Sequence, residues 1–255
     1  MFGLVRGWLD RRVIERSAIS EAEWRDAFAA VPLLDDLSRD EQARLRELSI
    51  LFLHRKSVFG ARGLEVSQPM QLIIALQACL PILEIGLDAY DGWTSVIVYP
   101  SGFMPEHVYT DEYGVEHHVV DELSGEAWQR GPVILAWDET RSAGIVDGMN
   151  LVIHEFAHKL DMQNGDANGF PPLHPGMDSG AWTAALSEGF EHFMHRCERG
   201  EDIGIDCYAA TSPAEFFAVL SEVFFEDPEL LNYHYETVYM QFSLYYRQDP
   251  MKRLR

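Results

Sequence analysis

Cysteine is scarce in this sequence. Its 255 residues include only three, Cys79, Cys197 and Cys207, an odd number with no C-x-x-C spacing. A disulfide framework needs paired cysteines, and a thiolate zinc site needs closely spaced ones. We therefore expect free thiols that belong to the core, and neither a disulfide nor a zinc site built from cysteine.

Basic residues are outnumbered two to one. The chain has 20 Lys and Arg against 41 Asp and Glu, which gives a formal net charge of −21. This charge repels nucleic-acid phosphates and anionic lipids, because both are bound mainly through clustered cations. We expect no nucleic-acid partner.

Long apolar runs are missing as well. The longest candidate, "MQLIIALQACLPILEIGL" at 70–87, is interrupted by Gln77, Pro81 and Glu84, and a membrane-spanning helix needs about 18 or more uninterrupted apolar residues. The first residues, "MFGLVRGWLDRRVIERS", contain no signal-peptide core. We expect a cytoplasmic protein without a membrane partner, and a buried helix at 70–87.

Hydrophobic residues are nevertheless abundant, at 47% of the chain, with 12% aromatic, enough for one large core. The stretch 20–54 holds two S-x-x-E capping boxes, and Ser67 with Pro69 is typical of a further helix start. Segments rich in Val, Tyr and Thr predict strands within 93–100, 106–122 (with a turn at Gly114) and 131–137. Helical patterns return at 151–161, 181–198, 212–225 and towards the C-terminus.

The segment "LVIHEFAHKLD", residues 151–161, places two histidines and a glutamate in an apolar helix that Asp147, in the preceding loop-like segment 138–148, can cap. His154 and His158 are four residues apart, so both imidazoles lie on one helix face and can bind one ion. Glu155 points about 100 degrees away, where it can reach a metal-bound water. This is the H-E-x-x-H pattern of zinc metalloproteases.

A catalytic zinc needs a third protein ligand. The metzincin pattern fails, because Asp161 stands at its glycine position and Asn164 at its histidine position. A carboxylate from a separate helix is therefore expected, and 212–225 offers Glu215 and Glu222. The residues alone leave this choice open, because Ser212 and Glu215 also form a capping box.

The segments "VIHEFAHKLDMQNGD" and "DCYAATSPAEFFAVLSEVFFEDPELL" resemble the bacterial Mlc titration factor A family, zinc peptidases of the gluzincin group related to the anthrax lethal factor protease domain. The resemblance covers most of residues 90–255 and is weaker over the N-terminal helices. It implies that His154, His158 and Glu215 are the metal ligands. Glu155 is then the general base, and Glu222 a carboxylate behind the ligands or facing the core.

The resemblance also implies that Tyr208 stabilises the oxyanion, although this tyrosine can equally anchor its loop. Asp161 is read either as an acceptor for a ligand imidazole or as a residue of the helix C-terminal turn. His117 and His118 point to opposite faces of a strand, and His192 and His195 are read as structural. The segment "GPVILAW" has two possible interpretations: an edge strand along which an extended substrate binds, or an interior strand.

The expected fold is α+β: a zincin-like metalloprotease core, with the active-site helix against a mostly antiparallel sheet, and additional N- and C-terminal helices. We expect one domain, 1–255, in which a helical part (about 1–90) packs on the catalytic part (about 91–255). The expected function is a peptidase with one zinc per chain, implied to be an aminopeptidase, which can also bind an Mlc-like repressor. A non-catalytic or autoinhibited anti-repressor that retains the zinc site, and a purely structural zinc site, are the alternatives.

Overall fold

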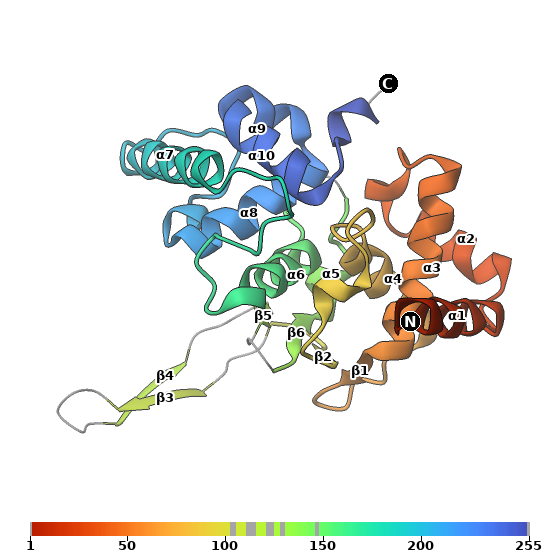
Figure 1. The fold of residues 1–255 in the computed structure, drawn as a ribbon. Helices are drawn as coiled ribbons and strands as arrows, with labels where there is room; N and C mark the ends of the chain where they lie inside the picture. Colours follow the sequence, from red (N-terminus) through yellow and green to blue (C-terminus); the bar gives the residue numbers. More distant parts are fainter. Residues whose placement is uncertain are drawn as a thin grey trace.

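The computed structural model describes residues 2–102, 106–110, 116–120, 125–127, 131–145 and 148–253 (Figure 1). Side chains are described in these ranges except at 2–6, 106–110, 116–120 and 125–127. Within this part of the chain, no helix is both long and apolar enough to cross a membrane. Asp147 and Gly114, expected to cap a helix and to form a turn, lie outside the described residues.

The N-terminal part is helical, as predicted. Its helices are α1 (Phe2–Glu15), α2 (Glu21–Ala29), α3 (Arg39–Arg55) and α4 (Gln68–Cys79), with the short η1 (Pro32–Leu34) and η2 (Leu87–Tyr90). Both predicted capping boxes form: the Ser20 and Ser38 hydroxyls each accept a hydrogen bond from a backbone N–H, and the backbone N–H of each serine donates to the carboxylate of Glu23 or Glu41. Helix α4 is almost entirely buried, which confirms the expected buried helix in part: it ends at Cys79, before Pro81, and does not continue to residue 87.

The main sheet has the strand order β1-β2-β6-β5, with β1 (Ser57–Gly60), β2 (Ser95–Tyr99), β5 (Gly125–Ala127) and β6 (Val133–Ala136). The pairs β1–β2 and β2–β6 are parallel, and only β5–β6 is antiparallel. The expectation of a mostly antiparallel sheet was therefore wrong for this sheet. The sheet is mostly parallel because it includes β1, a strand that was not predicted. Helix α4 follows β1 and connects it to the parallel strand β2, as crossover connections do.

A separate two-stranded ribbon is formed by β3 (Glu106–Thr110) and β4 (Glu116–Val120), which pair antiparallel. The predicted strand pairing within 106–122 is thus confirmed. Strand β6 corresponds to the predicted strand 131–137 and lies between β2 and β5. It is interior, and β5 is the sheet edge on that side.

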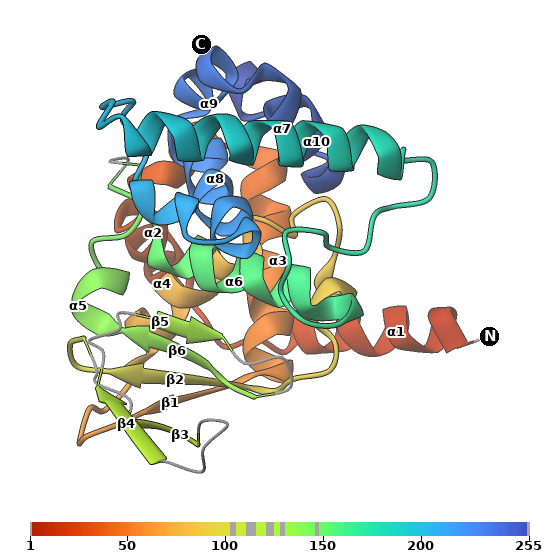
Figure 2. The same ribbon diagram turned by 90° about the vertical axis from the view of Figure 1, so that its left-hand side faces the viewer.

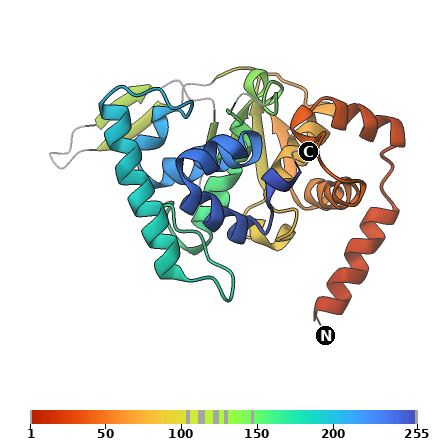
Figure 3. The same ribbon diagram turned by 90° about the horizontal axis from the view of Figure 1, so that it is seen from above.

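The second half of the chain stacks helices on the sheet. They are α5 (Trp137–Thr140), α6 (Leu151–Asp161), α7 (Ser179–Glu198), α8 (Pro213–Glu226), α9 (Pro228–His234) and α10 (Glu236–Tyr246), with the short η3 (Met162–Asn164), η4 (Cys207–Ala210) and η5 (Pro250–Lys252). Helix α6 covers one face of the sheet, α8 lies on α6, and α7 crosses above α8 (Figure 2). Seen from above, α1 projects away from these layers (Figure 3).

Buried side chains from both halves of the chain join in one core. Phe156 of α6 illustrates this, because its ring contacts Phe52 of α3 at 5.7 Å, Tyr90 at 5.2 Å and Trp93 at 5.7 Å between centroids. The apolar residues that surround the H-E-x-x-H motif thus fix α6 between the N-terminal helices and the sheet.

Two of the three cysteines form a disulfide, contrary to the expectation of free thiols. Cys197, near the end of α7, is bonded to Cys207 of η4, with 5.8 Å between their Cα atoms. The chain reverses after α7 and packs η4 back against it, which brings together cysteines whose spacing gave no signal. Cys79 is free and buried, as expected, and burial raises the pKa of its thiol.

Candidate metal centre

Helix α6 is capped at its N-terminus by the buried residue Asn150. Its side-chain oxygen caps the helix by accepting a hydrogen bond from Ile153 N at 3.0 Å, and Asn150 itself is fully buried. An N-cap of this kind satisfies one of the free N–H groups of the first helical turn. The start of the helix, and with it the direction in which His154 points, is therefore fixed.

Three side chains converge in the space between α6 and α8. His154 Nε2 lies 3.2 Å from His158 Nε2, and Glu215 Oε2 lies 3.1 Å from the first nitrogen and 3.3 Å from the second. Glu215 Oε2 is buried but forms a hydrogen bond with neither imidazole. Within the described residues, this is the one group of three His, Cys, Asp or Glu side chains that could hold a metal ion.

These separations can be tested against zinc chemistry. Zinc binds imidazole nitrogen and carboxylate oxygen at about 2.0–2.2 Å in tetrahedral geometry, which places neighbouring ligand atoms roughly 3.3–3.5 Å apart. The three measured separations, 3.1–3.3 Å, are close to the edges of one face of such a tetrahedron. Two nitrogens and one oxygen also form the ligand set of catalytic zinc sites with one open position. The donor set therefore fits the ion.

Glu215 lies in the first turn of α8, where the sequence left two roles open. The Ser212 hydroxyl accepts a hydrogen bond from Glu215 N at 3.1 Å, so the serine caps the helix. The carboxylate of Glu215 faces His154 and His158 instead of completing the capping box. Neighbouring imidazoles outweigh burial and lower the pKa of Glu215 to about 2, so it is ionised at neutral pH.

Glu222, two turns along α8, contacts the other side of His154. Its Oε1 lies 2.7 Å from His154 Nδ1, and its Oε2 accepts from Asn150 N. Burial acts to lower the pKa of His154, but the carboxylates of Glu215 and Glu222 raise it to about 10. A carboxylate behind a ligand imidazole fixes its orientation and makes its outer nitrogen more basic.

A third carboxylate on α8, Glu226, was not found by sequence reasoning. It is buried and accepts hydrogen bonds from Gly144 N at 3.2 Å, Gly148 N at 3.0 Å and Asn150 Nδ2 at 3.0 Å. It therefore holds the segment that leads into α6. The spacing of seven and four residues between Glu215, Glu222 and Glu226, which keeps them on roughly one helix face, is the signal that could have revealed it.

Glu155 is 4% exposed and lies on α6 beside His154. One turn further on, the buried ammonium of Lys159 donates to Gly131 O at 2.9 Å and lies 5.1 Å from the centre of the Trp93 ring. Burial lowers the pKa of Lys159 to about 8, an effect that the negative charge of Glu155 opposes. Glu155 is thus buried on the same helix as His154 and His158.

Tyr208 of η4 lies beside the three converging side chains. Its ring centre lies 6.2 Å from that of His154, and 50% of its side chain is exposed. Asp206 caps η4 by accepting from Tyr208 N at 2.9 Å. Burial, and then the nearby carboxylates of Glu215 and Glu155, raise the pKa of Tyr208. Its hydroxyl is therefore a proton donor that remains protonated at neutral pH.

Asp161 ends α6, and the structure decides between the two readings of it in favour of a turn. Its Oδ2 accepts from Asn168 N and from Gly169 N, each at 2.7 Å, and burial raises its pKa. Its Oδ1 and His158 Nδ1 are both buried without a hydrogen-bond partner among the described residues. Asp161 thus anchors the loop after the motif and forms no hydrogen bond with the imidazole.

Among the described side chains, no other histidine belongs to a group of potential metal ligands. His195 contacts Glu198 and His192 packs edge-on to Tyr235, and neither belongs to a group of potential ligands in the described part of the chain. His117 and His118 lie in β4, as the strand prediction required, but their side chains are outside the described set.

Comparison with known proteins identifies the family of this chain. A sequence model of the family described as glucose-regulated metallo-peptidase M90 matches residues 5–247. The chain is 42% identical to "Mlc titration factor A" of Serratia proteamaculans over 92% of this chain and 90% of the relative. It is 42% identical to the protein of the same name from Salmonella typhi, over 91% and 88%.

A further relative, "Mlc titration factor A" of Klebsiella pneumoniae, is 39% identical over 94% of this chain and 91% of that protein. The similarity therefore includes the N-terminal helices, where the sequence analysis expected only a weaker likeness. The chain belongs to the Mlc titration factor A family, the glucose-regulated metallo-peptidases M90.

Proposed function

We propose that this protein is a zinc-dependent peptidase in which Glu155 is the general base. The observation that carries the proposal is the convergence of His154 Nε2, His158 Nε2 and Glu215 Oε2 at 3.1–3.3 Å from one another, next to a buried glutamate. A structural zinc site is normally closed by four protein ligands, whereas three ligands leave a position for reaction.

His154, His158 and Glu215 would hold the ion. When bound, zinc lowers the pKa of a coordinated water towards about 7 and polarises a carbonyl group. The ligand imidazoles must be neutral to bind it, so metal binding displaces the proton that Glu215 and Glu222 favour on His154. Glu222 then keeps its hydrogen bond to Nδ1 and directs Nε2 into the site.

Glu155 would accept a proton from the attacking water and return it to the leaving amine. General bases of this kind must lie within hydrogen-bond reach of the proton that they remove, and the position of Glu155 next to His154 on α6 supports this role. The carboxylate is almost wholly buried, so little bulk water reaches it.

Tyr208 would donate a hydrogen bond to the oxyanion that develops on the substrate carbonyl. Its half-exposed side chain, close to His154 and protonated at neutral pH, supports this assignment. A donor aimed at developing charge is among the largest contributions to catalysis. The backbone of a peptide could lie along the β5 edge, since β5 packs against α6 and extended peptides add to exposed edges.

The substrate class follows from the resemblance described above, which implies aminopeptidase-type cleavage of short peptides. The experiment measures zinc content and hydrolysis of aminoacyl chromogenic substrates for the wild type and Glu155→Gln, with exposed Glu188→Gln as the matched control. We expect about one zinc per chain in all three and loss of hydrolysis only in Glu155→Gln. Absence of zinc from the wild type, or equal activity in all three proteins, would refute the proposal.

A second function is supported by the name of the relatives, Mlc titration factor A: binding of an Mlc-type transcriptional repressor. Such binding needs no general base, so Glu155→Gln should retain it fully while hydrolysis is lost. Size-exclusion chromatography of the protein mixed with purified repressor tests this. Zinc binding without hydrolysis in the wild type would leave repressor binding as the principal function.

A further inference from the structure

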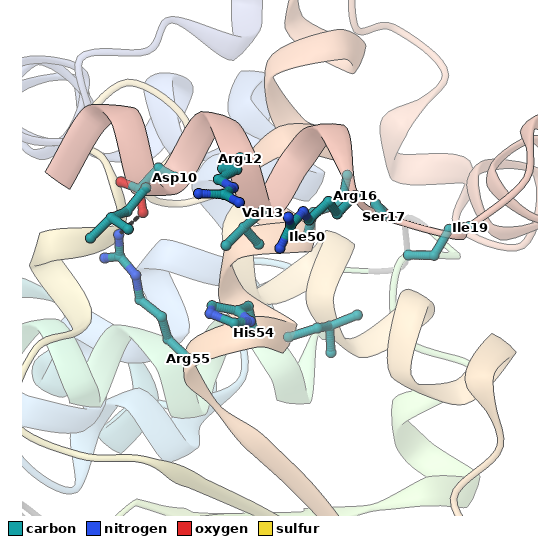
Figure 4. Close-up of a pocket in the computed structure, with 11 residues that line it drawn as sticks. Asp10, Arg12, Val13, Arg16, Ser17, Ile19, Ile50, His54 and Arg55 are labelled. Carbon is teal, nitrogen blue, oxygen red and sulfur yellow. Dashed lines mark hydrogen bonds and ion pairs between the residues drawn. The ribbon is translucent and has the colours of Figure 1, made fainter. Parts of the chain in front are cut away.

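A cavity of about 860 Å³ lies between α1 and α3 (Figure 4), and none of the residues of the metal centre line it. Its walls come from the C-terminal half of α1, the loop that follows, and the last turns of α3. Five of the eleven lining residues are apolar: Leu9, Val13, Ile19, Ile50 and Leu53. The volume is within the range of about 300–1,000 Å³ that is usual for small-molecule sites.

Cationic side chains gather on the same cavity. Arg12 lies in the last turn of α1 and Arg16 directly follows this helix, and both line the cavity together with His54 of α3 (Figure 4). Arg55, also in the lining, is bound to Asp10 at 2.6 Å. The side chains of Arg12, Arg16 and His54 therefore lie next to the apolar part of the cavity lining.

These cationic side chains have no carboxylate partners in the described part of the molecule, which is unexpected in so acidic a chain. Among the described residues, Arg12, Arg16 and His54 form no ion pair with a carboxylate, although the chain has 41 Asp and Glu. Arg12 instead lies over the ring of the exposed Trp8, at 5.0 Å from its centre. An anion at the cavity would find cationic side chains that no carboxylate of the described residues neutralises, in a chain whose overall net charge of −21 repels anions elsewhere.

We propose that this cavity binds an amphiphilic anion with one hydrocarbon chain, such as a long-chain fatty acid. The hydrocarbon chain of the ligand packs against the apolar walls between α1 and α3, and Arg12, Arg16 and His54 bind its carboxylate. Guanidinium groups bind carboxylates by paired, charge-assisted hydrogen bonds. A partner helix, about 10–12 Å across, would have to separate α1 from α3, which contact each other beside the cavity; a single hydrocarbon chain would not.

The test uses the full chain and dodecanoate below its micelle concentration, with binding followed by isothermal calorimetry. We expect saturable binding that Arg12→Gln/Arg16→Gln weakens roughly tenfold or more, because hydrogen bonds to charged groups are lost. Arg12→Lys/Arg16→Lys should retain part of the affinity. Arg11→Gln is the matched control, since Arg11 is exposed on the same helix but does not line the cavity, and should bind like the wild type.

Dodecyltrimethylammonium, which has the same chain length and the opposite charge, should bind much more weakly. Equal binding of the two amphiphiles would indicate unspecific adsorption and overturn the proposal, as would equal loss of affinity in Arg11→Gln. Absence of dodecanoate binding would also overturn it. If the Arg12 and Arg16 substitutions instead abolish sedimentation with phosphatidylglycerol vesicles and monomeric dodecanoate does not bind, the surface contacts membranes and the cavity is no fatty-acid site.

Discussion

Glu222 Oε1 lies 2.7 Å from His154 Nδ1, on the side of the imidazole opposite to the three converging ligand atoms. Glu222→Ala removes this partner and leaves the ring free to turn. Because partners behind a ligand typically contribute about 10–100-fold to metal affinity, we expect zinc to bind at least tenfold more weakly. Competition with a chromophoric chelator measures this, with exposed Glu229→Ala as the control. Unchanged zinc affinity would contradict the positioning role.

Glu226 stabilises the fold at the entrance to α6. Glu226→Ala leaves the N–H groups of Gly144, Gly148 and the Asn150 side chain without their acceptor. An unsatisfied buried donor costs about 1–3 kcal/mol, and the three losses are not additive. We expect the free energy of unfolding in urea to fall by about 3 kcal/mol, against less than about 0.5 kcal/mol for Glu229→Ala on the surface.

The carboxylate of Glu41 makes the free energy of unfolding depend on pH in the acidic range. It accepts from Ser38 N at 2.9 Å and from Arg253 at 2.7 Å, which joins the C-terminal segment to α3. Burial acts to raise the pKa of Glu41, but Ser38 and Arg253 lower it below its ordinary value. The folded state therefore binds fewer protons than the unfolded state, so this contribution is complete above the ordinary pKa of 4.5 and is lost as the pH falls through the folded pKa.

We consequently expect the wild type to lose more stability than Glu41→Gln when the pH is lowered from about 6 to about 3. Urea unfolding at a series of pH values measures the difference. Glu47→Gln, an exposed substitution on the same helix, should follow the wild type. Parallel stability curves for the wild type and Glu41→Gln would show that the contact with Arg253 does not stabilise the protein.

Tyr208→Phe tests the oxyanion donor separately from the metal. Loss of one such donor typically lowers kcat by about 10²–10³-fold, and we expect little change in KM because the ring remains. Zinc content should equal that of the wild type, since Tyr208 is not among the three converging ligands. The control is Tyr233→Phe, which removes a hydroxyl from a side chain that is 82% exposed. A kcat like that of the wild type would assign Tyr208 to loop anchoring.

Local signals in the sequence predicted much of this molecule. The capping serines, the proline after Ser67 and the apolar spacing around the H-E-x-x-H motif act within one or two turns of helix, and these elements form where expected. The choice of Glu215 over Glu222 came from the family resemblance. The structure places Glu215 beside both imidazoles and Glu222 behind one.

Features that depend on distant parts of the chain could not be read in this way. Strand β1 is four residues long and mostly exposed, so it has little periodicity, yet it makes the main sheet largely parallel. The Cys197–Cys207 bond depends on the path of the chain after α7. Glu226 finds its donors 76 to 82 positions away. That the chain forms one domain, and that it is cytoplasmic, stay predictions.

The three converging side chains come from two helices, α6 and α8, so they are not synthesised at the same time. His154 and His158 emerge from the ribosome well before Glu215, and Asn150 can be held by Glu222 and Glu226 only after α8 exists. A nascent chain that lacks α8 thus presents two imidazoles without their carboxylate partner. If the proposed function holds, tight metal binding would therefore await the synthesis of α8, and a truncated or stalled chain would have no hydrolytic activity.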